Sequence, residues 1–155
     1  MENIGRENKL DNDIFFVCSI IEFIGRSTKN KRNDVVNKLG ETELLRLLEL
    51  ADVLHCEPIE ATSDRLIKSY GLSEGDYDNV TLCKYSIPTQ FDIAKVYKRL
   101  VVDLINTQKI KPVQALNEVY TSWITDKIDD YNSSMYYENP QYIFTSYIAG
   151  KALAD

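Results

Sequence analysis

The segment NDIFFVCSIIEFIGR, residues 12–26, constrains the fold most strongly because it is apolar around most of a helical wheel. Its apolar positions recur every three or four residues, which predicts one helix. The stripe comprises Ile14, Val17, Cys18, Ile21 and Ile24, and it is widened by Phe15, Phe16, Ile20 and Phe23. A stripe this broad cannot face water on one side, so we expect this helix to lie in the middle of a core.

The rest of the chain continues the helical period between recognisable boundaries. Further helices are expected to begin near residues 33, 41, 58, 89, 112 and 140, and the one that begins at 112 is expected to run to 128. Pro58, Pro112 and Pro140 suit first helical positions, where a missing N–H costs nothing. Thr89 with Asp92 three residues later is typical of a capping box. Strands do not alternate with helices, so a parallel sheet is disfavoured.

Residues 71–88, GLSEGDYDNVTLCKYSIP, lack a clear period. Gly71, Gly75 and Asp76 indicate turns, and a short extended piece over residues 80–85 remains open. A chain of 155 residues suits one domain. We therefore predict an all-α protein, a compact bundle of six or seven helices with a less regular connector at 71–88. Residues 1–155 are expected to form one domain, in which sub-halves 12–72 and 89–154 could pack around one core.

Charge argues against nucleic acid as a partner. The chain carries a net charge of −6, and residues 41–90 hold four Lys or Arg against ten Asp or Glu. An acidic protein repels a phosphate backbone unless it has a strong basic face. The one basic cluster, expected to be a solvated helix connection, is Arg26, Lys29, Lys31 and Arg32. Two acidic groups are expected to form solvated faces: Glu57, Glu60 and Asp64, and Asp126, Asp129 and Asp130.

The cysteines and the apolar runs predict a cytoplasmic protein that does not enter a membrane. Cys18, Cys56 and Cys83 are odd in number and form no CxxC pair, which fits a reducing compartment. The longest apolar run is too short to span a bilayer. The first residues lack the apolar core of a signal peptide.

Tyrosine is concentrated in the stretch YNSSMYYENPQYIFTSY, residues 131–147, which holds five of the ten tyrosines. We expect Tyr131 to close a helix, Tyr136 and Tyr137 to lie in a loop, and Tyr142 and Tyr147 to lie on the last helix. Base stacking needs neighbouring cations, and the neighbours here are acidic. Packing explains most of these rings. The candidate anchors for a partner protein are Trp123, Tyr136, Tyr137 and Tyr142.

His55, in ADVLHCEPIE, is the only histidine and the only candidate catalytic base. It cannot pair with the adjacent Cys56, because neighbouring residues on a helix diverge. Cys18, Cys83 or a carboxylate could still approach it in the fold; the alternative is a helix-end histidine that contacts the last carbonyls. Metal-ligand spacing and phosphate-cradling glycine loops are absent, so no metal and no cofactor are expected.

Four stretches together resemble a known family: FFVCSIIEF (15–23), DVVNKLG (34–40), LLELADVLHCE (47–57) and SDRLIKSYGL (63–72). The family comprises small all-helical proteins of unknown function from low-GC Gram-positive bacteria, often encoded beside proteins that resemble ADP-ribosyltransferases. The shared positions are Phe16, Val17, Glu22, Gly40, Asp52, Val53, Leu54, His55, Asp64, Ile67 and Tyr70. The resemblance covers about residues 12–72 and implies an antitoxin-like or adaptor-like role; about 80 further residues follow it.

The leading hypothesis is a non-enzymatic protein-interaction module whose partner is another protein, such as a toxin-like enzyme. Two alternatives stay open. One is a small enzyme whose site assembles in three dimensions around His55. The other is a structural homodimer in which two subunits share the helix at 12–26.

Overall fold

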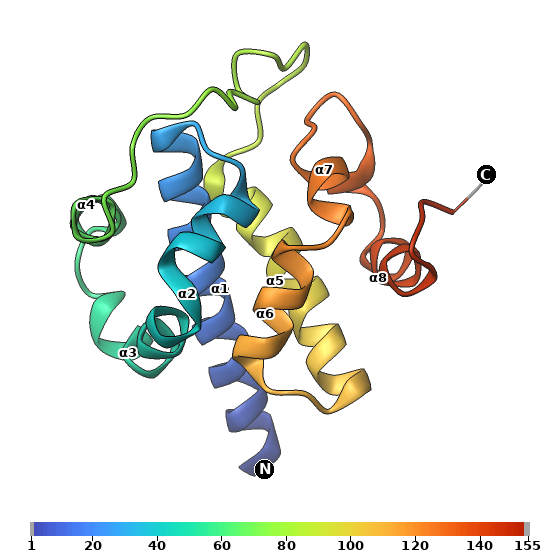
Figure 1. Ribbon diagram of the computed structural model, residues 1–155. Helices are drawn as coiled ribbons and strands as arrows, with labels where there is room; N and C mark the ends of the chain where they lie inside the picture. Colours follow the sequence, from blue (N-terminus) through green and yellow to red (C-terminus); the bar gives the residue numbers. More distant parts are fainter. Residues whose placement is uncertain (1, 154–155) are drawn as a thin grey trace.

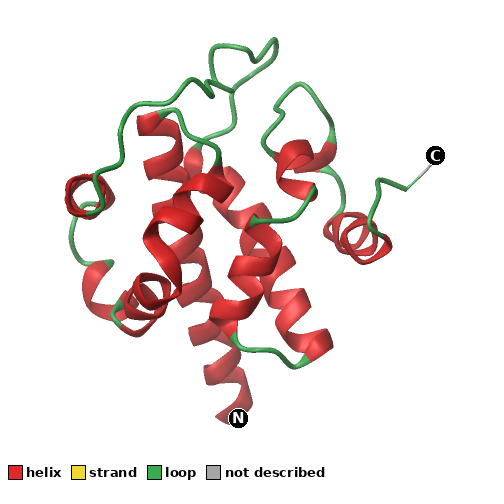
Figure 2. Cartoon of the chain, in the orientation of Figure 1, coloured by secondary structure: helices red, strands yellow, loops and turns green. Residues whose placement is uncertain are grey.

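The computed structural model describes the backbone of residues 2–153 and the side chains of residues 9–153. Within this range the chain is helical and contains no strand (Figures 1 and 2), so the all-α prediction is confirmed. The helices are α1 (Glu2–Thr28), α2 (Arg32–Glu49), α3 (Ala51–Leu54), α4 (Ile59–Ser69), α5 (Gln90–Gln108), α6 (Pro112–Tyr120), α7 (Ile124–Ile128) and α8 (Pro140–Ala149), with a 3₁₀ turn η1 (Met135–Tyr137). None of these described helices is both long and apolar enough to cross a membrane.

Helix α1 occupies the centre of the bundle, as its broad apolar stripe predicts. It packs against α5, α2 and α4, and α5 in turn packs against α6 and α8 (Figure 1). All five positions of the predicted stripe are fully buried: Ile14, Val17, Cys18, Ile21 and Ile24. The buried apolar residues of both halves of the chain form one cluster around this helix.

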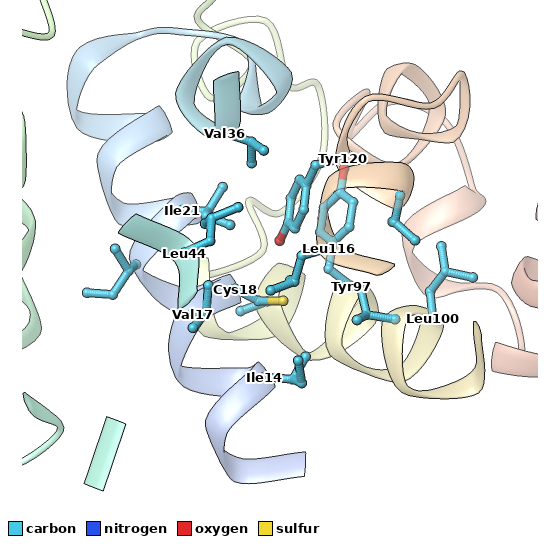
Figure 3. Close-up of a cluster of buried hydrophobic side chains, with 14 of the residues drawn as sticks. Ile14, Val17, Cys18, Ile21, Val36, Leu44, Tyr97, Leu100, Leu116 and Tyr120 are labelled. Atoms are coloured by element: carbon cyan, nitrogen blue, oxygen red, sulfur yellow. The ribbon is translucent and has the colours of Figure 1, made fainter. Parts of the chain in front are cut away.

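Two aromatic rings close the middle of this core. Tyr97 of α5 and Tyr120 of α6 are fully buried and stacked, with ring centroids 4.3 Å apart. Figure 3 shows the rings side by side with their hydroxyl groups at opposite ends, so that the hydroxyl of Tyr120 points toward Cys18. Tyrosine at these positions brings polar groups into the interior, and those groups need partners there.

Local sequence signals set the starts of α5 and α8, whereas Pro58 is the N-cap of α4 and not its first residue. The Oγ1 of Thr89 accepts a hydrogen bond from the Asp92 N–H at 3.0 Å, and the Asp92 carboxylate accepts one from the Thr89 N–H at 2.9 Å. This is the predicted capping box. Asn139 caps α8 by accepting from the Gln141 N–H at 2.8 Å. Gly40 has a φ of 80°, a conformation that favours glycine, and it kinks α2 between the two segments predicted there.

The helix predicted over residues 112–128 is wrong in one respect: it breaks into α6 and α7. The hydroxyl of Thr121 donates to the carbonyl of Asn117 at 2.6 Å, and that of Ser122 donates to the carbonyl of Val119 at 2.7 Å. Such local side-chain bonds compete with helical hydrogen bonding. The apolar period of this segment continues across the break, which is why the sequence pattern alone suggests one helix.

The connector at 71–88 is confirmed as irregular, and the extended piece left open at 80–85 does not pair as a strand. At its start, the N–H groups of Gly75 and Tyr77 donate to the carbonyls of Thr28 and Lys29 at 2.8 and 2.9 Å. At its end, the side-chain amide of Asn132 bonds the connector backbone twice. These contacts satisfy backbone groups that would otherwise need a partner strand.

Candidate functional site

A buried ion pair lies between α1 and the start of α2. Arg32 Nε donates to Glu22 Oε1 at 3.1 Å, and both side chains are fully buried. Arg32 Nη1 also donates to the carbonyl of Asn30 at 3.0 Å. The arginine passes over Gly25, where any Cβ would overlap its side chain. The expectation that Arg32 belongs to a solvated connection is therefore wrong, because its charge partner lies ten residues back on the central helix.

A second buried carboxylate, Asp129, lies near this pair. Its Oδ1 accepts from the Tyr97 hydroxyl at 2.7 Å, and its backbone carbonyl accepts from the Asn79 side chain at 2.9 Å. Burial raises the pKa of Asp129 to about 7, and the charge of Glu22 acts in the same direction. The solvated face predicted here exists at Asp126 and Asp130, which are exposed, but Asp129 turns inward.

Arg26 joins the end of α1 to the start of α5 and to the segment after α7. Its Nη2 donates to the carbonyl of Pro88 at 2.8 Å and to the hydroxyl of Tyr131 at 3.0 Å. The guanidinium also lies 5.5 Å from the centre of the Tyr131 ring, a cation–π distance. Tyr131 is buried and follows the end of α7 by three residues, so it serves packing, as expected, although it does not close the helix.

Arg26 and Asp129 contact two loops at one end of the bundle, residues 79–87 and 129–138, which we call the tyrosine end. The Lys84 N–H donates to Asn132 Oδ1 at 2.8 Å, and Asn132 Nδ2 donates to the carbonyl of Leu82 at 2.9 Å. In Figure 1 the connector and the loop after α7 lie at the same end of the molecule. The two loops therefore form one surface, although they are about 50 residues apart in the sequence.

Large side chains project into solvent from the tyrosine end. Leu82 and Tyr85 are each 68% exposed, and Tyr137 is 67% exposed. Tyr136 is half-buried and makes edge contacts with Tyr137 and Tyr131, at centroid distances of 4.9 and 5.8 Å. A row of rings thus runs from the buried Tyr131 to the exposed Tyr137.

The four predicted anchors are placed differently. Tyr136 and Tyr137 lie together at the tyrosine end. Trp123 is half-buried just before α7, and Tyr142 is half-buried on α8, where its hydroxyl donates to the carbonyl of Leu153 at 2.9 Å. Leu82 and Tyr85 are exposed at the same end as the tyrosine pair, but no pattern in the sequence marks them as anchors. Only their position on an irregular connector hints at exposure.

The tyrosine end itself carries two carboxylates at its surface, Asp130 and Glu138, and one lysine, Lys84; most of the acidity lies in the segments that flank it. Residues 71–92 and residues 126–142 each contain four Asp or Glu and one Lys, so each has a net charge of −3 and together they have −6. Asp129 is the one buried acid in these two segments, so the net charge of their exposed residues is −5. Lys29, from outside these segments, contacts Glu74 at 3.4 Å and Asp78 at 3.9 Å. One added cation does not reverse the sign.

His55 follows α3 and is exposed. Its Nδ1 lies 3.1 Å from the carbonyl of Ala51, which is the helix-end contact considered from sequence. The His55 ring also lines a cavity of about 450 Å³, which three carboxylates line as well. Among the described residues, the contact of His55 with the Ala51 carbonyl is the one hydrogen bond that its ring forms.

The cysteines do not supply a nucleophile for His55. Cys18 is fully buried, and burial raises the pKa of its thiol to about 12, so the thiolate is scarce at neutral pH. The Sγ atoms of Cys83 and Cys56 contact the carbonyls of Tyr85 and Asp52 instead. Among residues 9–153, no group of three or more His, Cys, Asp and Glu is placed to hold a metal ion.

The apolar face of residues 12–26 is used within the chain itself. Its stripe packs against α5 and α2, as described above, so this face is not free to form a subunit interface without unfolding. A homodimer would have to use another surface.

These features define a small all-α protein with a charged network inside its core and an acidic, aromatic surface at one end. Neither a family model, nor a curated protein, nor a solved structure matches the chain.

Proposed function

We propose that this chain is a non-enzymatic protein-interaction module that binds a basic protein surface with its tyrosine end. The observation that carries the proposal is the exposure of Leu82, Tyr85 and Tyr137, each about two-thirds open to solvent, on two loops that are joined to each other. Aromatic side chains dominate interface energies when a partner covers them. Single exposed apolar residues are common, but three large ones at one end suggest a binding surface.

The charge of the tyrosine end supports a basic partner. Together with the flanking residues of 71–92 and 126–142, its surface carries about five net negative charges, which would attract a positive surface and speed the encounter. The same charge repels nucleic acid, whose phosphates need cations close to the stacking rings. The rings with acidic neighbours therefore fit a protein better than a polynucleotide.

Hydrogen bonds to the protein interior and between the two loops hold both loops in place, so binding costs little conformational entropy. Asn132 joins them through two backbone contacts, and Asn79 is fixed to the carbonyl of Asp129. Arg26 secures the buried end of the row of rings at Tyr131. A surface that is already ordered loses less freedom when a partner docks.

The kind of partner follows from the resemblance of residues 12–72. An antitoxin-like or adaptor-like protein encoded beside an ADP-ribosyltransferase-like enzyme would meet a protein that handles a phosphate-bearing substrate. Sites for such substrates are commonly basic. An acidic, tyrosine-rich surface is suited to cover a basic cleft of this kind, and we extend the proposal to a toxin-like enzyme as the partner.

The test is capture from native lysate followed by measurement with the purified prey. The double variant Leu82→Ser/Tyr137→Ala removes two exposed side chains, and Val53→Ser on α3, whose side chain is 69% exposed, is the control. We expect a prey with a basic surface to be lost with the double variant and kept with the control. With that prey purified, calorimetry should show binding at least about tenfold weaker for the double variant and weakening with added salt. Equal affinity of all three proteins would refute the proposal.

A further inference from the structure

A cavity of about 450 Å³ lies between the middle of α1, α3 with the loop that follows it, and the starts of α4 and α5. Its volume is in the range of small-molecule sites. The apolar part of its wall is mainly aromatic and comes from Phe15 and Phe16 of α1, Phe91 of α5 and Ile59 of α4. The ring of Phe91 lies 6.1 Å from that of Phe15 and is nearly half exposed, so it is accessible from solvent.

The polar part of the wall is acidic. Asp13, Asp52 and Glu57 line the cavity, and among the described residues that line it none is Lys or Arg. Two cations contact these carboxylates from outside. Lys9 Nζ lies 2.9 Å from Asp13 and 3.1 Å from Asp52, while Arg65 lies 2.6 Å from Glu57. Three carboxylates share two cations, which leaves one uncompensated negative charge at the rim.

Lys9 shows how this rim holds an ammonium group. Its Nζ lies between the carboxylates of Asp13 on α1 and Asp52 on α3, which are 39 residues apart in the sequence. The lysine side chain is 55% exposed and that of Asp52 is 72% exposed, so the ion pair is accessible to solvent. Exposed pairs such as Lys9–Asp52 contribute little stability, so a ligand that displaces Lys9 from Asp52 costs the fold little.

We infer that this cavity binds a small organic cation, an ammonium compound with an aromatic or alkyl body. The ammonium group is held at Asp13 and Asp52 by charge-assisted hydrogen bonds, and the body lies against the phenylalanine rings. A neutral molecule of the same shape keeps the apolar contacts and loses the ionic ones. An anion of the same shape is repelled by the uncompensated negative charge of the rim. This site is separate from the tyrosine end and does not depend on the proposed function.

Tryptamine is a suitable probe, because it joins an ammonium group to an aromatic body, and tryptophol is its neutral control with a hydroxyl in place of the ammonium. Both are titrated into the ¹⁵N-labelled full chain and followed by NMR. Tryptamine is expected to cause saturable shifts at the amides of Asp13, Ala51, His55 and Phe91. Tryptophol is expected to bind at least about fivefold more weakly, since it lacks the charge-assisted bonds.

Two carboxylate variants assign the site. Asp52→Asn removes a rim charge from an exposed position and is expected to weaken tryptamine binding several-fold. Asp64→Asn, an equally exposed change on α4 outside the cavity, should leave it unchanged. The inference is overturned if tryptamine causes no saturable shift up to about 5 mM, if the shifts lie elsewhere, or if tryptophol binds as well. An unchanged affinity for Asp52→Asn would overturn the assignment of the ammonium to this rim.

Discussion

Replacing Arg32 by methionine tests the buried charge network directly. Methionine keeps much of the apolar length of arginine, so the main change is the loss of the one cation among residues 9–153 that forms an ion pair with Glu22. Glu22 is then left buried and uncompensated, since it has no exposed surface through which water could solvate it. Breaking a buried pair in this way costs about 3–5 kcal/mol. A domain of this size has a total stability of about 5–15 kcal/mol, so the variant should lose from about a fifth of it to nearly all of it.

The second arm of this experiment is Glu22→Gln in the Arg32→Met background. The double variant no longer buries a charge at this position, so we expect it to recover about 2 kcal/mol or more relative to Arg32→Met alone. Burial already raises the pKa of Glu22, and loss of Arg32 raises it further. The single variant should therefore lose less stability at pH 5, where Glu22 can take up a proton, than at pH 8.

The assay is urea unfolding followed by far-UV circular dichroism, with Arg99→Met as the control. Arg99 is exposed on α5, and its replacement should change the free energy of unfolding by less than about 0.5 kcal/mol. The reasoning is refuted if Arg32→Met costs less than about 1 kcal/mol, or if Glu22→Gln destabilises both backgrounds equally. Either result would mean that the two side chains do not depend on each other for burial.

Three further predictions concern the interior. The folded-state pKa of Asp129, about 7, is above its ordinary value of 3.8, so its contribution to stability is fully present below pH 4 and is lost as pH rises through 7. Asp129→Asn keeps an oxygen that can accept the hydrogen bond of the Tyr97 hydroxyl, and it should reduce the loss of stability between pH 5 and pH 8. Urea midpoints at the two pH values measure this loss. The same loss in the variant as in the original protein would refute the role of Asp129. Gly25→Ala should lower the free energy of unfolding by about 1–3 kcal/mol, because the added methyl group overlaps the Arg32 side chain. The same change should cost less in the Arg32→Met background. Equal costs in the two backgrounds, measured by thermal unfolding, would contradict the overlap. Exposed Cys56 should react with a thiol reagent in the native state, whereas buried Cys18 should react only when the protein unfolds. Rapid labelling of Cys18 in the native state would show that this residue is not buried.

Features encoded over short distances in the chain could be predicted from sequence. The apolar stripe of residues 12–26 identifies the central helix, because no exposed helix could tolerate it. The capping box at Thr89 and the Asn139–Pro140 start depend on neighbours two or three residues away. The turn residues at 71–76 likewise mark the irregular connector.

Features that depend on distant partners could not be predicted. Arg32 lies among four basic residues that resemble a solvated connection, and only the fold places Glu22 beneath it. Asp129 stands next to exposed Asp130, yet it turns inward to meet Tyr97, which is 32 residues away. Both cases involve charges whose burial is tolerable only with a partner, and the partner is not adjacent in sequence.

The candidate site was partly predictable. Tyr136 and Tyr137 stand out in a tyrosine-rich stretch, and their place in a short segment between helices follows from Pro140. Leu82 and Tyr85 could not be assigned to the same surface, because the contact of Asn132 with the connector spans about 50 residues. A sequence pattern shows which residues are apolar but does not show which of them a fold leaves uncovered.

Hydrogen–deuterium exchange of the chain alone and in complex with its captured partner tests the proposed binding surface most directly. Binding at the tyrosine end should slow exchange at residues 82–85 and 136–138, and leave α2 and α3 unchanged. Protection confined to α2 or α3, with unchanged exchange in both loops, would show that the chain recognises its partner through a different face.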